Sequence, residues 1–106
     1  MAEKKLNLKL IKQFKAFHAN NPHVWQQFNT YAHELIKRGR RRISHGTIIE
    51  RLRWDALIST SGLDYKLNQN YGAFYARLFE YRNIRYRGLF ARRNSVADLM
   101  DMSTIK

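Results

Sequence analysis

Apolar residues recur at three- and four-residue intervals in four separate parts of this chain, and this spacing is typical of amphipathic helices. The first helix is expected over residues 6–17. The second is expected over about 22–38, because Pro22 suits a first helical position and Gly39 a helix end. A third is expected to run to residue 57, with Ser44 as its cap, and a fourth over about 70–81.

A different pattern follows the fourth helix. Between residues 84 and 90, apolar side chains alternate with arginines on either side of Gly88, which predicts a short β-hairpin. The last residues, 94–106, are mildly amphipathic and are expected to form either a short helix or a frayed tail.

The order of these elements predicts a mainly α fold in a single domain over residues 1–106. A short extended piece before the third helix and a hairpin after the fourth resemble a winged helix-turn-helix domain, in which the fourth helix would enter the major groove of DNA. The connector over residues 59–67 is longer than the usual turn of that motif. An all-helical bundle without a wing is the main rival.

The charge of the chain indicates its class of partner. Among 106 residues there are 20 Lys or Arg and 8 Asp or Glu, which gives a net charge of +12. Such a charge repels itself unless a polyanion neutralises it, and nucleic acid is the polyanion that gains most from releasing its counterions. An anionic membrane or an acidic protein would also neutralise it, so charge alone does not choose among them.

The sequence offers no catalytic or metal-binding pattern. It has no cysteine, and its histidines and carboxylates lack metal-ligand or catalytic spacing, so neither an enzyme nor a cofactor is expected. The acids Glu50 and Asp55 are expected to pair with Arg51 and Arg53. No apolar run is long enough to span a membrane and no secretory signal is evident, so a cytoplasmic protein is expected.

Polar residues at the start of the fourth helix are candidate readers of DNA bases. Asn and Gln pair bidentately with adenine, and a good pair discriminates by about 1–3 kcal/mol. The alternative is that each Asn merely caps the helix. The candidate base readers are Asn68, Gln69, Asn70 and Tyr71, and Arg77 on the same helix is a candidate phosphate contact.

Two groups of arginines are candidate phosphate contacts, and the alternative is a solvated basic face. The second group is interleaved with aromatic residues, which suits a wing on the DNA backbone or stacking on single-stranded bases. The first group is Arg40, Arg41 and Arg42, and the second is Arg85, Arg87, Arg92 and Arg93. Duplex DNA is therefore the expected ligand, with RNA or single-stranded DNA as alternatives, and dimerisation is left open.

Several short motifs between residues 17 and 93 resemble a family of small basic proteins encoded by bacteriophages and prophages. The motifs are Asn21-Pro22-His23-Val24-Trp25, Arg53-Trp54, Lys66-Leu67-Asn68-Gln69-Asn70-Tyr71, Phe74-Tyr75-Ala76-Arg77-Leu78 and Gly88-Leu89-Phe90. The resemblance implies a bacterial host cytoplasm and no particular activity. It is compatible with a DNA-binding regulator or accessory factor, and also with an inhibitor of a bacterial host protein, such as an anti-CRISPR factor.

Overall fold

The computed structural model describes residues 2–58, 67–91 and 95–105. Within these ranges the four predicted helices are confirmed, each with ends a few residues from the expected ones. The elements are α1 (Ala2–Asn20), α2 (Pro22–Lys37), α3 (His45–Ile58), α4 (Tyr71–Arg82) and the short 3-10 helices η1 (Ile84–Tyr86), η2 (Val96–Leu99) and η3 (Met102–Thr104).

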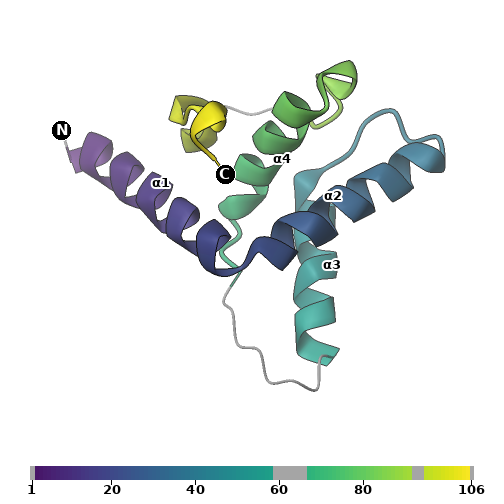
Figure 1. Ribbon diagram of the computed structural model, residues 1–106, viewed down its shortest axis with the longest axis horizontal. Coiled ribbons are helices and arrows are strands. Elements are labelled where there is room, and N and C mark those ends of the chain that lie inside the picture. Colours follow the sequence, from purple (N-terminus) through teal and green to yellow (C-terminus); the bar gives the residue numbers. More distant parts are fainter. Residues whose placement is uncertain (1, 59–66, 92–94, 106) are drawn as a thin grey trace.

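The helices α1 and α2 form two arms that meet at Asn21, and α4 lies over their junction (Figure 1). Pro22 is the first residue of α2, as expected. The side-chain amide of Asn21 donates to the carbonyl of Phe17 at 3.0 Å, so it closes the end of α1 instead of capping α2. The helix α3 runs away from α2 and contacts both α2 and α4.

The core is built around α4. Every residue of this helix except Ala73, Tyr81 and Arg82 is buried. On one side Phe74 stacks on Phe14 of α1, with ring centroids 4.6 Å apart. The neighbours of α4 in the core come from all three other α-helices and from the C-terminal segment, so the helix is enclosed on nearly every side.

This burial bears on the predicted winged-helix architecture. A recognition helix must leave one face free to enter the major groove, and α4 has no such face. The hairpin predicted after α4 does not form either, because Ile84–Tyr86 is a 3-10 helix and a turn at Gly88 follows it. In the described ranges the chain is therefore a helical bundle, and the winged-helix comparison is not confirmed.

The described part of the C-terminal segment, residues 95–105, is not a frayed tail. Ala97, Met100, Met102 and Ile105 are buried, and η2 and η3 pack against α4. The segment is also anchored by Ser95, whose hydroxyl accepts from the amide of Ala97 at 3.1 Å in a capping box. The fold thus uses residues 95–105 to complete its core.

Candidate nucleic-acid interface

A glycine turn at the end of α2 sets the direction of the first arginine group. Gly39 has φ +86°, its amide donates to the carbonyl of Ile36 at 3.0 Å, and the amide of Arg40 donates to the carbonyl of Leu35 at 3.1 Å. These two bonds form a Schellman motif, which favours glycine at the left-handed position. The turn reverses the chain and leads it into Arg40, Arg41 and Arg42 at the surface.

A second glycine turn presents the second arginine group. Arg87 has φ −58° and ψ 131°, Gly88 has φ +87°, and the amide of Leu89 donates to the carbonyl of Tyr86 at 3.0 Å. These values describe a type II turn, which places Arg87 at an exposed corner and needs a positive φ at the next residue. Arg85 lies just before it, in η1.

A short parallel β-bridge joins the two turns. The amide of Ile43 donates to the carbonyl of Leu89 at 2.9 Å, and the amide of Ala91 donates to the carbonyl of Ile43 at 3.1 Å. The amide of Phe90 between them donates to the buried carboxylate of Glu80 at 3.0 Å. Two arginine groups that lie far apart in the sequence are therefore fixed side by side.

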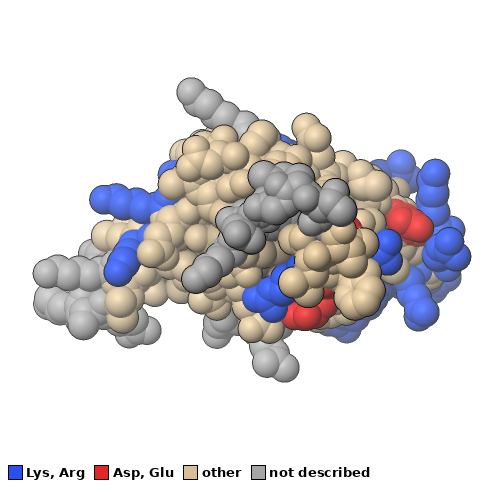
Figure 2. Space-filling model, turned by 90° about the horizontal axis from the view of Figure 1, so that it is seen from below, with Lys and Arg blue, Asp and Glu red and all other residues tan. Residues whose placement is uncertain are grey.

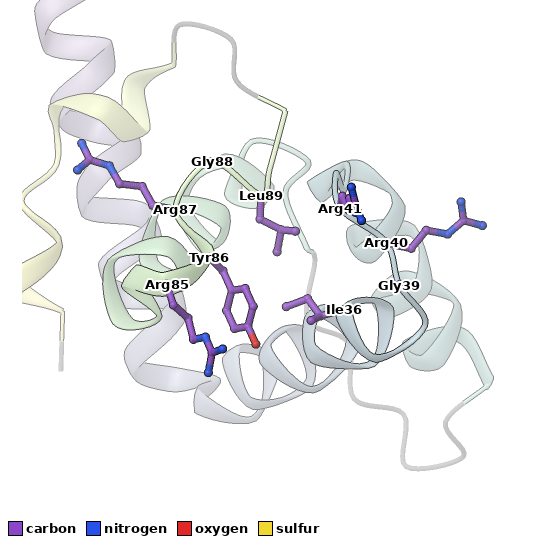
Figure 3. Close-up of a pocket in the computed structure, with 9 residues that line it drawn as sticks. All are labelled: Ile36, Gly39, Arg40, Arg41, Arg85, Tyr86, Arg87, Gly88 and Leu89. Carbon is purple, nitrogen blue, oxygen red and sulfur yellow. The ribbon is translucent and has the colours of Figure 1, made fainter.

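The two turns enclose a shallow, open hollow of about 400 Å³. Figure 3 shows the side chains of Leu89 and Tyr86 pointing into it toward Ile36, while Arg40 and Arg87 extend outward on opposite sides. Arg85 lies beside Tyr86, with its guanidinium carbon 5.3 Å from the ring centroid. The hollow thus has an apolar and aromatic floor and a basic surround.

We call the basic surround the arginine rim. It consists of Arg40, Arg41, Arg42, Arg85 and Arg87. All five residues are exposed, and none makes an ion pair with another described residue. Figure 2 shows blue side chains crowding the end of the molecule at which α2 ends, with little red among them. Like charges held close together in this way favour an anion that neutralises several of them at once.

The predicted base readers lie elsewhere. Asn68, Gln69 and Asn70 are exposed, but at the start of α4, about 18 Å of helix away from the end that leads to the arginine rim. The side-chain oxygen of Asn68 accepts from the amide of Asn70 at 2.9 Å, which is a local turn contact. Tyr71 is only 7% exposed, with its ring 5.0 Å from that of Phe17, so its side chain packs in the core instead of standing at the surface.

Arg77 is also placed differently from the prediction. It is 7% exposed, and its Nε donates to a carboxylate oxygen of Asp98 at 2.7 Å. A guanidinium buried in this pair joins α4 to η2, so Arg77 is not among the exposed arginines of the described residues. Arg92 and Arg93, the remaining predicted contacts, lie outside the described residues.

The sequence did not single out the floor of the hollow. Ile36 belongs to the apolar stripe of α2, and near the end of the helix it lines the hollow. Leu89 and Tyr86 were expected in hairpin strands. The one available signal was a glycine next to each arginine group, Gly39 and Gly88, since such pairs mark turns that expose their neighbours.

The carboxylates of α2 and α3 are engaged in surface ion pairs. As predicted, Arg53 pairs with Glu50 at 2.9 Å and Arg51 with Asp55 at 3.3 Å. In the described part of the chain, no three His, Asp or Glu residues are grouped so as to hold a metal ion. None of the helices described is long and apolar enough to cross a membrane.

No family model matches the chain, and neither a curated protein nor a solved structure does. The resemblance to phage-encoded proteins stays a prediction from short motifs. The geometry of the arginine rim and of the hollow that it surrounds is therefore what indicates a function.

Proposed function

We propose that this protein binds nucleic acid, and that the arginine rim contacts the phosphate backbone. One observation carries the proposal: the bridge between Ile43 and Phe90 brings two arginine groups together, and none of these arginines makes an ion pair with a described carboxylate. Phosphate contacts position a protein on nucleic acid and release bound counterions, which supplies most of the affinity of nonspecific binding.

The geometry favours backbone contact over the reading of a base sequence by α4. That helix is buried, and its exposed start with Asn68 and Asn70 faces away from the end that leads to the arginine rim. DNA remains the expected nucleic acid, and a regulator or accessory factor in a bacterial host remains the expected role. Binding to an acidic host protein is the competing hypothesis.

The experiment is a salt titration of binding to a fluorescent duplex, measured by anisotropy. The test variant is the double substitution Arg41→Gln and Arg87→Gln, which removes one charge from each group. If each arginine contacts one phosphate, we expect the slope of log Kd against log salt to fall by about 2.

The matched control is the double substitution Lys9→Gln and Lys12→Gln, which removes the same charge from the exposed face of α1. We expect this variant to keep nearly the full slope of the unmodified protein. The proposal is overturned if the unmodified protein fails to bind nucleic acid at low salt. It is also overturned if the slope of log Kd against log salt falls by the same amount in the two variants. Stoichiometric binding to an acidic protein, without any binding to nucleic acid, would support the competing hypothesis.

A further inference from the structure

The floor of the hollow is more elaborate than phosphate contact requires. A phosphate needs charge and hydrogen-bond donors, whereas Ile36, Tyr86 and Leu89 offer apolar and aromatic surface between the arginines. An anion gains nothing from such surface. A nucleobase does, because its two flat faces are apolar and stack on aromatic rings.

The ring of Tyr86 is held in place by its neighbours. It stacks on Phe79 of α4, with centroids 6.3 Å apart and an interplanar angle of 29°. The ring of His33 from α2 meets it edge-on at 6.0 Å. Two helices thus fix the ring at the hollow, so a ligand that stacks there does not have to order it first.

The surround of the hollow suits a base that is attached to a strand. The guanidinium of Arg85 lies over the Tyr86 ring, and both groups are flat surfaces of the kind on which unpaired bases stack. Arg40 and Arg87 extend to opposite sides of the hollow, so a strand crossing it passes both cations (Figure 3). In a duplex the bases are stacked inside and do not reach a concave floor of this kind.

We propose that the hollow receives an unpaired base, and that single-stranded nucleic acid is the preferred ligand of the arginine rim. This inference rests on the proposed function, since it names the form of nucleic acid that the same site binds. Phosphates then contact the other arginines of the rim, while one base packs against the guanidinium of Arg85 and against the parts of Tyr86 and Ile36 that line the hollow.

The experiment compares three fluorescent DNA ligands of equal length: a single strand, the same strand with abasic sites at its central positions, and a duplex. Stacking contributes about 1–3 kcal/mol per base, so the single strand is expected to bind at least about fivefold more tightly than the abasic strand. Because the two strands carry the same phosphates, this ratio measures the contribution of the bases alone.

Three variants at two tyrosines then locate the effect. Tyr86→Leu is expected to bring the ratio of the two affinities close to one, whereas Tyr86→Phe keeps the ring and is expected to keep the ratio. Tyr81→Leu is the control, because Tyr81 is 56% exposed on α4 and does not line the hollow. The thermal unfolding midpoint of each variant shows whether it folds. If Tyr86→Leu does not fold, the ratio that the unmodified protein gives for the intact and abasic strands is the test.

The outcomes separate this inference from the proposed function. Equal affinity for the intact and abasic strands overturns the inference and leaves phosphate binding in place. A duplex that binds more tightly than the single strand also overturns it, and so does a ratio that Tyr86→Leu leaves unchanged. If none of the three ligands binds at low salt, the proposed function itself is overturned.

Discussion

His45 occupies the first turn of α3, where burial, and secondarily the positive charge of Arg77, lower its pKa below the ordinary value of 6.5. The folded protein therefore holds a proton on this imidazole less readily than the unfolded chain does. The resulting stability is present above about pH 6.5 and is lost as the pH falls, because the unfolded state then takes up the proton first.

We expect the free energy of unfolding to fall as the pH is lowered from about 7.5 to about 5.5. Urea titrations of the unmodified protein and of His45→Gln over this range check the prediction. The variant, which cannot titrate at this position, should show a smaller fall than the unmodified protein. Parallel pH curves for the two proteins would show that His45 does not contribute.

Individual residues also show where a sequence misleads. Arg77 and Tyr71 carry polar groups and stand near the start of a predicted recognition helix, so exposure was the natural expectation. Arg77 is instead buried because Asp98, which is distant in the sequence, folds back to pair with it. Tyr71 is buried because α1 covers it with Phe14 and Phe17. Neither partner can be found from local spacing.

Among the elements, α3 and α4 approach each other closely at Gly72. A Cβ atom added there would lie 2.6 Å from Nδ1 of His45 and 2.9 Å from Cγ1 of Ile49. These distances are too short for contact without movement of α3 or of its side chains. The glycine therefore sets the separation of two helices that both contribute to the core.

We expect Gly72→Ala to lower the free energy of unfolding by about 1–3 kcal/mol, as overpacking of a core does. Gly46→Ala is the matched control, because its added Cβ meets only the hydroxyl of Ser44 at 3.4 Å. The free energy of unfolding of Gly46→Ala should rise by up to about 1 kcal/mol, because alanine has a higher helix propensity than glycine. Chemical denaturation of both variants measures the two effects, and a loss of stability in both or in neither would contradict the account.

The helices were predictable because apolar spacing is a local property, and proline and glycine mark their ends in the sequence. The hairpin was not, since the alternation around Arg85 and Arg87 does not correspond to alternating burial: Ile84 is 75% exposed. Here a 3-10 helix followed by a type II turn carries the same short alternation of apolar residues and arginines that a strand would carry. The sequence did not decide between a short helix and a frayed tail for the C-terminal segment, because its buried residues follow successive 3-10 turns and not one helical period.

At the scale of the whole molecule, the sequence identified the arginines but not the surface that they share. Composition alone indicated a polyanionic partner. Spacing in the sequence also singled out candidate phosphate contacts, among them the exposed Arg40, Arg41, Arg42, Arg85 and Arg87. Their proximity depends on the bridge between Ile43 and Phe90, a contact between segments far apart in the chain. The floor of Ile36, Tyr86 and Leu89 depends on the same contact, so local patterns could not reveal it.

The most direct test of the central claim is an NMR titration of the 15N-labelled protein with a short oligonucleotide. The amides of Arg41 and Gly88, one from each turn, are expected to shift together and to report the same Kd, while those of Lys9 and Lys12 on α1 shift little. This result would show that a single ligand contacts both arginine groups. Shifts confined to one group, or spread evenly over α1 and the two turns, would contradict the claim that the arginine rim is one binding surface.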